Sequence, residues 1–546
     1  MKPSQIKGLE RLYRRRISSG EVITLELARE LADLSLEMRR QVGILVNRLG
    51  DIEYVIIGNE RGILIPEISD YPLGRRMLRG LRLIHTHLRE EPLSDDDLTD
   101  LAMLRLDLLV ALQLSPNDTR MNIQIASLSP PSEGKTPCHV EPAQPFGRFQ
   151  MDFSAFVSTL EGSLEKAAKG SQSVRGSEER GMLISVTQRP REEAEDDIDE
   201  LKELARTAGV EVLDTVIQRP RQFNPRYLMG EGKIRDVVIR ALQLGATLLI
   251  FDQELTPTQI RSISELTELK VIDRSQLILD IFARRAKSLD GKVQVELAQL
   301  KYLLPRLTGR GVQMSRLMGG IGGRGPGETK LEVDRRRIRD RIAKLERELG
   351  ELSHGRYQRR QKRVRAGLPI VSIVGYTNVG KSTLLNALTR SKVFTENLLF
   401  ATLDTSTRRL RFPREREVII TDTVGFIRSL PASLMGAFKA TLEELQDADL
   451  LLHLVDCANP RFEEQMSQVD QILAEIGLAD KPRLLVFNKA DRLPGLKSAS
   501  PLAFLKARQL ARRHNAIFVS ALDPASLEPL LSEMEQRFWA ADTPSH

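Results

Sequence analysis

Two glycines frame the stretch Gly375-Tyr376-Thr377-Asn378-Val379-Gly380-Lys381-Ser382, which follows the apolar run Ile370-Val371-Ser372-Ile373-Val374. A strand, this Gly-x-x-x-x-Gly-Lys-Ser turn and a helix form a phosphate-binding loop, because the glycines let successive N–H groups point at a phosphate. Lys381 is expected to bridge the β- and γ-phosphates, and the hydroxyl of Ser382 to coordinate Mg²⁺. The stretch therefore predicts an α/β nucleotide-binding (P-loop) domain over residues 367–546.

A second motif, Asp422-Thr423-Val424-Gly425, ends the apolar run Val418-Ile419-Ile420-Thr421. The spacing puts the Asp422 carboxylate beside the metal and the N–H of Gly425 near the γ-phosphate. Between the two motifs, Thr402 is expected to close over Mg²⁺ when the γ-phosphate is present. The predicted catalytic residues are therefore Lys381, Thr402 and Gly425, and the predicted Mg²⁺ ligands are Ser382, Thr402 and Asp422.

A third motif, Asn488-Lys489-Ala490-Asp491, follows the run Leu484-Leu485-Val486-Phe487 and is suited to reading guanine. The Asp491 carboxylate can accept hydrogen bonds from N1–H and the exocyclic amine of guanine, and adenine offers neither. The order of the three motifs predicts GTP as the substrate. Its predicted binding residues are Gly375, Tyr376, Thr377, Asn378, Val379, Gly380, Lys381, Ser382, Thr383, Asp422, Thr423, Val424, Gly425, Asn488, Lys489, Asp491, Ser520, Ala521 and Leu522.

The residue after Gly425 is Phe426, where Ras-like enzymes carry a glutamine that orients the attacking water. A phenyl ring cannot hydrogen-bond that water, so hydrolysis by the isolated chain is expected to be slow. The sequence offers no identifiable arginine finger. We therefore expect a partner to complete the site.

Composition bounds the class of protein. At 546 residues, with 28% charged and 41% hydrophobic residues, the chain is expected to form several globular domains. No apolar run approaches the roughly 18 residues that span a bilayer, and the first residues lead into a charged segment rather than a signal peptide. With Cys138 and Cys457 alone, a disulfide framework is excluded, and we expect a cytoplasmic monomer.

The net charge of +7 is concentrated in one predicted element. Residues 331–366 hold thirteen Lys and Arg against six Asp and Glu, a surplus of seven. Two sets of apolar residues recur at spacings of three and four, and each predicts a helix. We expect these helices to pair as a long antiparallel hairpin over 289–366, ended or kinked early at Pro305. The two sets are Val293, Leu297, Leu300, Leu304 and Leu307, and Ile338, Ile342, Leu345, Leu349 and Leu352.

A glycine-rich loop, residues 309–330, joins the two predicted helices. Its glycines disfavour regular structure and let the backbone approach a partner closely, while its arginines favour phosphate. The alternative is a solvated loop beside a solvated charged helix. We favour structured RNA, recognised by phosphate and shape. The predicted RNA-binding residues are Arg310, Arg316, Arg324, Arg335, Arg336 and Arg337.

Three stretches resemble the HflX family of GTPases. They are Gly319-Gly320-Ile321-Gly322-Gly323-Arg324-Gly325-Pro326-Gly327-Glu328 with the residues up to Arg336, Gln294-Val295-Glu296-Leu297-Ala298-Gln299-Leu300, and Asp422-Thr423-Val424-Gly425-Phe426-Ile427-Arg428. The resemblance covers roughly residue 181 to the C-terminus. It implies a GTP-hydrolysing factor that binds the large ribosomal subunit and its rRNA, dissociates stalled or idle ribosomes, and also uses some ATP.

Residues 181–288 alternate between strand and helix patterns, which predicts a small α/β domain with a parallel sheet. The expected strands are 182–186, 210–218, 247–251 and 270–272, and the expected helices are 197–208, 232–244, 257–267 and 275–286. The stretch Gly230-Glu231-Gly232-Lys233 lacks the full spacing of a phosphate loop, so a helix N-terminus is favoured there. In HflX proteins this region is the N-terminal domain, and it is where a second nucleotide site for ATP would be sought.

Residues 1–126 lie outside the HflX resemblance and are expected to form an α+β domain. A Ser-, Pro- and Gly-rich linker, 127–180, with one helix at 153–169, is predicted to follow it. Here His85-Thr86-His87, Ser94 and Asp97 resemble the motif of the JAMM metalloproteases and RadC-like proteins. Two imidazoles and one carboxylate can hold Zn²⁺, with Glu37 as the base that activates a water.

The zinc motif departs from the pattern of those proteins. The interval from His87 to Ser94 is one residue short, and Leu88 stands where proline is typical. Asp95, Asp96 and Asp100 are rival carboxylates, and a helix cap beside a structural histidine pair is the alternative interpretation. Two other functions remain open beside the ribosome factor: a nucleotide-regulated zinc peptidase, and a GTP- or ATP-dependent RNA-remodelling factor.

Overall fold

The computed structural model describes residues 2–66, 68, 70–71, 77–115, 121–130, 137–169, 179–307, 330–365, 368–389, 399–400, 406–412, 416–428, 444–493 and 501–539. Thr402 and the glycine-rich loop, with Arg310, Arg316 and Arg324, lie outside these residues. The chain divides into two compact units. The first comprises 1–198, 210–251 and 258–271, and the second comprises 199–209, 252–257 and 272–546.

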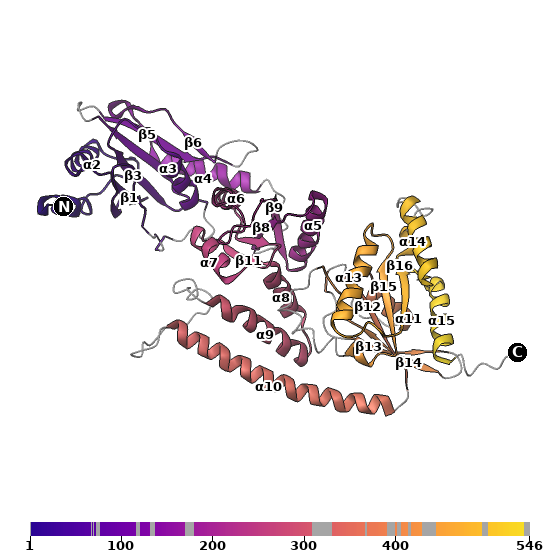
Figure 1. The fold of residues 1–546 in the computed structure, drawn as a ribbon. Coiled ribbons are helices and arrows are strands. Elements are labelled where there is room, and N and C mark those ends of the chain that lie inside the picture. The colour runs from indigo at the N-terminus through magenta and orange to yellow at the C-terminus, as the bar shows by residue number, and fades with distance from the viewer. Residues whose placement is uncertain are drawn as a thin grey trace. The chain divides into compact units, whose positions relative to one another are not determined.

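The N-terminal region of the first unit is built on a seven-stranded sheet of order β2-β1-β3-β4-β5-β6, with β7 paired to β5 (Figure 1). The central strands β3 and β4 are parallel and buried along their whole length. The other strand pairs of this sheet in the described part of the chain are antiparallel. The elements are α1 Pro3–Leu12, α2 Leu25–Met38, β1 Val42–Asn47, β2 Ile52–Ile57, β3 Leu81–His87, α3 Asp95–Leu104, β4 Leu108–Leu114, β5 Met121–Leu128, β6 Cys138–Val140, β7 Gln144–Pro145 and α4 Phe153–Lys169.

The predicted linker 127–180 is wrong over much of its length. Strand β5 runs to Leu128, β6 and β7 pair with it, and α4 packs on the core of residues 2–128. The helix itself was predicted at its observed bounds. Four of its apolar residues recur at helical spacing and are buried in that core: Phe153, Val157, Leu160 and Leu164. The Ser, Pro and Gly content around them obscured a helix that completes the domain.

A second sheet has four strands in the order β11-β10-β8-β9, and the pairings of β8 with β9 and with β10 are parallel. The predicted alternation of strands and helices over 181–288 is confirmed. The strands are β8 Glu179–Val186, β9 Val210–Gln218, β10 Leu248–Phe251 and β11 Lys270–Asp273. The helices are α5 Arg191–Thr207, α6 Glu231–Gln243, α7 Pro257–Leu266 and α8 Arg274–Arg285. Gly230 is the N-cap of α6, as the sequence favoured.

The two helices of the predicted hairpin, α9 Leu289–Leu303 and α10 Lys330–Arg365, pack against each other (Figure 1). We call this pair the basic arm. Val293, Leu297 and Leu345 form its buried seam, with Leu300, Ile342, Leu349 and Leu352 packed beside it. Arg341 makes two hydrogen bonds to Glu296, at 2.7 and 2.8 Å. A 3₁₀ turn replaces the α-helix at Leu304–Leu307, so α9 ends just before Pro305 as predicted.

The C-terminal domain has a six-stranded sheet of order β13-β14-β12-β15-β16-β17. Among the described residues of this sheet, neighbouring strands are parallel except β13 and β14, which are antiparallel. Because its parallel strands end at one edge, loops from separate parts of the chain meet there. The strands are β12 Ile370–Gly375, β13 Ser406–Arg411, β14 Glu417–Asp422, β15 Leu450–Asp456, β16 Arg483–Asn488 and β17 Ile517–Phe518. The helices are α11 Lys381–Thr389, α13 Phe462–Glu475, α14 Pro501–His514 and α15 Glu528–Trp539.

Among the described helices of both units, none is both long and apolar enough to cross a bilayer.

Candidate functional site

The predicted phosphate loop joins β12 to α11 and depends on its two glycines. Gly375 and Gly380 have φ angles of +154° and +95°. A Cβ on Gly375 would lie 2.3 Å from the carbonyl oxygen of Leu454, and one on Gly380 would lie 2.5 Å from Nδ2 of Asn488. Neither position has room for a side chain. The loop therefore approaches β15 and the Asn488 loop closely, and it ends at the first turn of α11, where helix N–H groups are available.

We expect Gly380→Ala to weaken GTP binding at least about tenfold, because the new Cβ strains the backbone and displaces Asn488. Titration calorimetry with GTP measures the effect. Gly477→Ala is the matched control, since Gly477 also has a positive φ, +76°, but a Cβ there would meet nothing within 4 Å. Equal GTP affinities for the two variants would contradict the assignment of the loop.

Asn488 ties the base-reading loop to the phosphate loop. Its Nδ2 donates to the carbonyl of Val379 at 2.7 Å, and its Oδ1 accepts from the N–H of Ala521 at 3.0 Å. Asn488 is buried, at 1% exposure, so both bonds are shielded from water. One side chain thereby holds together three of the segments predicted to bind GTP.

Lys489 and Asp491 are held by different partners. Lys489 Nζ donates to the carbonyl of Asn378 at 2.8 Å and pairs with Asp456 at 2.7 Å. The hydroxyl of Ser520 donates to Oδ1 of Asp491 at 2.6 Å, which orients the carboxylate. Asp491 is exposed at the surface of the domain, as a residue that reads a ligand must be.

Lys381, Ser382 and Asp422 meet at the start of α11. Lys381 is buried and donates to the carbonyls of Gly375 and Tyr376, at 3.2 and 2.8 Å. Burial lowers the pKa of Lys381 to about 8, although the negative charge of Asp422 acts to raise it. The hydroxyl of Ser382 donates to Oδ2 of Asp422 at 2.6 Å. A hydroxyl and a carboxylate oxygen so close together are the donor set that Mg²⁺ prefers.

The Asp-x-x-Gly segment lies directly against the phosphate loop. The N–H of Thr377 donates to the carbonyl of Phe426 at 2.7 Å, and the N–H of Phe426 donates to the carbonyl of Gly375 at 3.1 Å. A Cβ on Gly425 would lie 2.8 Å from Nζ of Lys381. The Phe426 side chain is buried, so it offers no group to orient a water. Of the other predicted residues, Thr423 and Val424 are buried and Leu522 is exposed.

A polar network around Tyr376 was not foreseen from the sequence. The Tyr376 hydroxyl donates to Glu200 of α5 at 2.7 Å and accepts from the N–H of Arg428 at 2.6 Å. Arg274 of α8 pairs with Glu200 and donates to the carbonyl of Arg428 at 3.1 Å. Burial and the charge of Glu200 raise the pKa of Tyr376, so the hydroxyl stays protonated. The motif pattern treats Tyr376 as a variable position, and no local signal links it to Glu200.

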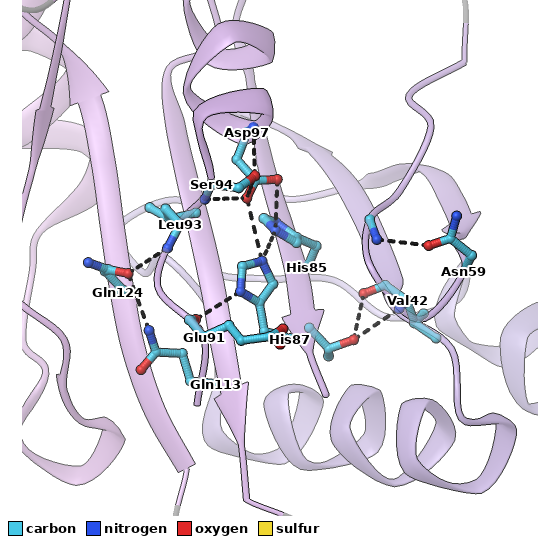
Figure 2. Close-up of polar contacts among 12 residues, drawn as sticks. Val42, Asn59, His85, His87, Glu91, Leu93, Ser94, Asp97, Gln113 and Gln124 are labelled. Atoms are coloured by element: carbon cyan, nitrogen blue, oxygen red, sulfur yellow. Dashed lines mark hydrogen bonds and ion pairs between the residues drawn. The ribbon is translucent and has the colours of Figure 1, made fainter. Parts of the chain in front are cut away.

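A second cluster lies in the N-terminal domain, where β3 and α3 bring together His85, His87 and Asp97 (Figure 2). The Nε2 atoms of the histidines are 2.8 Å apart. Asp97 oxygens lie 3.4 Å from Nε2 of His85 and 3.6 Å from Nε2 of His87. Both imidazoles are buried. Of the four carboxylates considered at the start of α3, the structure brings Asp97 to the histidines.

The cluster has supporting hydrogen bonds of its own. Nδ1 of His87 lies 2.9 Å from the carbonyl of Glu91, which can only accept, so Nδ1 carries the proton in the neutral ring. Ser94 donates to Oδ2 of Asp97 from its N–H at 2.8 Å and from its hydroxyl at 2.7 Å, in a capping box (Figure 2). Although burial acts in the other direction, the histidines hold the pKa of Asp97 well below its usual range. Because Nδ1 of His87 carries the proton, the Nε2 atom of the neutral ring has a lone pair that a metal ion can accept.

Glu37 is not the base expected at this cluster, and that part of the prediction is wrong. Glu37 is an exposed residue of α2 that accepts from Nε2 of Gln5 at 3.2 Å. Helix α2 contacts β3 through Ser35, whose hydroxyl lies 2.7 Å from that of Thr86. Side chains alternate along a strand, so Thr86 and the two histidines face opposite sides of the sheet. Glu37 is thus on the side away from His85 and His87.

The C-terminal domain, with its glycine-dependent loop, its Asp422 and Gly425 segment and its Asn488 to Asp491 loop, has the fold and site of a P-loop GTPase. Three family models match the chain: "GTP-binding GTPase N-terminal" at 195–283, "GTP-binding GTPase Middle Region" at 285–363 and "50S ribosome-binding GTPase" at 370–489. The chain belongs to the HflX family of GTPases. It therefore hydrolyses GTP, and Mg²⁺ is the metal typical of such enzymes.

Two HflX GTPases illustrate the relationship. The protein of Caldanaerobacter subterraneus subsp. tengcongensis is 47% identical over 361 residues, which cover 66% of this chain and 81% of the relative. That of Escherichia coli is 42% identical over 342 residues, covering 63% and 79%. Among solved structures, a GTP-binding protein from Sulfolobus solfataricus in complex with GDP is 26% identical, with a TM-score of 0.36, and the match covers 65% of this chain and 98% of that one. None of the three family models reaches residues 1–194.

Proposed function

We propose that this GTPase binds the large ribosomal subunit and its rRNA in the cytoplasm and dissociates stalled or idle ribosomes. The observation that carries the proposal is the basic arm, whose helix α10 holds most of the net positive charge of the chain. Of the predicted RNA-binding residues on α10, Arg336 and Arg337 are exposed, as groups that contact phosphates must be, and Arg335 is half-buried. The match to a ribosome-binding GTPase model over 370–489 supports the same partner.

The Tyr376 network offers a route from the nucleotide to the arm. Tyr376 belongs to the phosphate loop, and Arg428 lies three residues beyond Gly425, which is expected to sense the γ-phosphate. Tyr376 bonds to Glu200, the carbonyl of Arg428 accepts from Arg274, and Glu200 and Arg274 pair with each other. Arg274 is the first residue of α8. Helix α8 packs on α9 of the basic arm. In this proposal a movement of Gly425 toward the γ-phosphate changes these bonds and so the arm, while Thr402 closes over Mg²⁺.

Hydrolysis should depend on the ribosome, because Phe426 cannot orient the attacking water. We expect purified large subunits to raise the GTP hydrolysis rate at least about tenfold, as measured by phosphate release under multiple turnover. Small subunits at the same concentration are the control. A full hydrolysis rate in the isolated protein, unchanged by any ribosomal particle, would contradict the proposal. The same assay with ATP in place of GTP tests whether the protein also hydrolyses ATP.

We further propose that the N-terminal domain binds Zn²⁺ through His85, His87 and Asp97. Zn²⁺ takes nitrogen and carboxylate ligands at about 2.0–2.2 Å, so tetrahedral geometry separates its ligand atoms by about 3.3–3.6 Å. The two Nε2 atoms are 2.8 Å apart, and Oδ1 and Oδ2 of Asp97 lie 3.4 Å from Nε2 of His85 and 3.6 Å from Nε2 of His87. One ligand atom from each residue can thus be chosen so that all three lie within 4.8 Å of one another, and a bound ion would move the two imidazoles slightly apart. The Glu91 carbonyl and Ser94 supply the outer bonds that orient metal ligands.

The metal content of the whole protein, purified without chelator, tests the zinc proposal. We expect about one zinc per chain by mass spectrometry, and loss of that zinc in His87→Ala. His139→Ala is the matched control, because His139 is exposed on β6 and remote in sequence from the cluster. Wild-type protein without zinc, or zinc retained in His87→Ala, would remove the proposal.

A further inference from the structure

Gln41 stands immediately before β1, the strand that pairs with β3. Strands β1 and β3 are antiparallel, with Gly43 opposite His85. The paired residues end at Gly43, and the next residue, Val42, bonds to the hydroxyl of Thr86 through its N–H at 2.9 Å and its carbonyl at 3.3 Å. Two residues beyond the last pair, the same register would set Gln41 opposite His87. A Cβ on Gly43 would lie 3.4 Å from Cβ of His85, so both residues project from the same face of the sheet. Because side chains alternate along a strand, this register would put Gln41 on that face too.

Gln41 has an unusual environment for a polar side chain. It is 1% exposed, and its Oε1 has no hydrogen-bond partner among the described residues. Leaving a buried acceptor without a partner costs about 1–3 kcal/mol, so such an atom calls for a reason. The backbone of Gln41 is fixed by two bonds to the segment after β2, since its N–H donates to the carbonyl of Asn59 at 2.9 Å and its carbonyl accepts from the N–H of Gly58 at 2.8 Å.

Gln113, on the strand at the other side of His87, is a useful contrast. It lies opposite His87 in the parallel pairing of β3 and β4 and is also buried. Its Nε2 donates to Oε1 of Gln124 at 3.2 Å, and the same oxygen accepts from the N–H of Leu93 at 2.9 Å (Figure 2). Gln113 thus belongs to a hydrogen-bonded frame, whereas the Gln41 oxygen does not.

We propose that the Oε1 atom of Gln41 is the fourth ligand of the metal ion, which makes the N-terminal centre a closed Zn²⁺ site. This inference rests on the proposed zinc site and goes beyond it. Three protein ligands leave one tetrahedral position, and catalytic zinc sites keep it for a water, whereas structural sites fill it from the protein. An amide oxygen in that position also cannot take a proton, as a base would. The centre binds metal and is not a peptidase.

Zinc affinity of the full chain, measured by competition with a chromophoric chelator, tests the role of Gln41. We expect Gln41→Leu to weaken zinc binding at least about tenfold, because it removes the oxygen and keeps an apolar group of similar length. Gln41→Glu should tighten binding, since a charged carboxylate replaces a neutral ligand. Gln113→Leu should bind zinc within about threefold of wild type. The visible spectrum of the Co²⁺-loaded protein should report four-coordination in wild type and a change in Gln41→Leu.

The outcomes separate the two proposals. Zinc bound to Gln41→Leu with wild-type affinity and an unchanged Co²⁺ spectrum would overturn the role of Gln41 and leave the three-ligand site. Wild-type protein that binds no zinc would overturn both. Thermal unfolding of the N-terminal domain is measured on every metal-free variant by calorimetry, because GTP affinity reports only on the C-terminal domain. A Gln41→Leu variant with lost zinc, a metal-free unfolding transition like that of wild type and a normal Gln113→Leu control would support the proposal.

Discussion

Asp491→Asn is expected to lower the affinity for GTP at least about 100-fold and to create binding of xanthosine triphosphate. The carboxylate of Asp491 can accept hydrogen bonds from N1–H and from the exocyclic amine of guanine. The amide of asparagine has only one acceptor oxygen, so its NH₂ group would face the exocyclic amine, and two donors cannot form a hydrogen bond. Xanthine carries an oxygen at that position, so the amide of the variant can both accept from N1–H and donate to the new oxygen. Ser520, which donates to Asp491 at 2.6 Å, can still donate to an amide oxygen.

Equilibrium binding of fluorescent GTP and xanthosine triphosphate analogues measures this change. Asp480→Asn, at an exposed carboxylate of the same domain, removes the same charge without touching the site. It should bind GTP as wild type does. If Asp491→Asn kept its preference for GTP, the Asn488 to Asp491 loop would not be the base reader.

Replacing Arg335, Arg336 and Arg337 together with alanine is expected to weaken binding to the large ribosomal subunit by about 100-fold. The loss should be electrostatic: each phosphate contact contributes about 0.7–0.9 to the slope of log affinity against log salt. The slope should therefore fall by about 2–3. GTP affinity should not change, because these residues lie on α10 and outside the nucleotide site.

The matched control removes three arginines from another helix, α14, as Arg508, Arg512 and Arg513 to alanine. This variant has the same net charge as the α10 variant. If both variants lost affinity equally, the effect would belong to the overall charge, and the basic arm would not be the RNA-binding surface. Binding is measured at several salt concentrations by light scattering or sedimentation.

The parts of the molecule that could be predicted from sequence are those specified by local patterns. A Cβ on Gly375 or Gly380 would strike a neighbouring atom, so the loop requires glycine at both positions. Glycines at this spacing therefore predict the conformation of the phosphate loop. The seam of α9 and α10 was predicted from spacings of three and four, and Val293, Leu297 and Leu345 are indeed buried between the helices. The elements over 181–288 followed from their alternation in the same way.

The errors concern contacts between residues that are distant in the chain. Glu37 was chosen as a base by its position before a strand, but the sheet separates α2 from the histidines. No local pattern marks Gln41, because its proposed position opposite His87 depends on the register of β1 and β3. The bonds of Tyr376 to Glu200, 176 residues away, likewise depend on tertiary packing that no local pattern encodes.

The most direct test of the account is co-sedimentation of the full-length protein with purified large ribosomal subunits in the presence of a non-hydrolysable GTP analogue. We predict stoichiometric binding with the analogue, much weaker binding with GDP, and weak binding of the Arg335, Arg336 and Arg337 variant. Failure to bind large subunits in any nucleotide state would contradict the central claim.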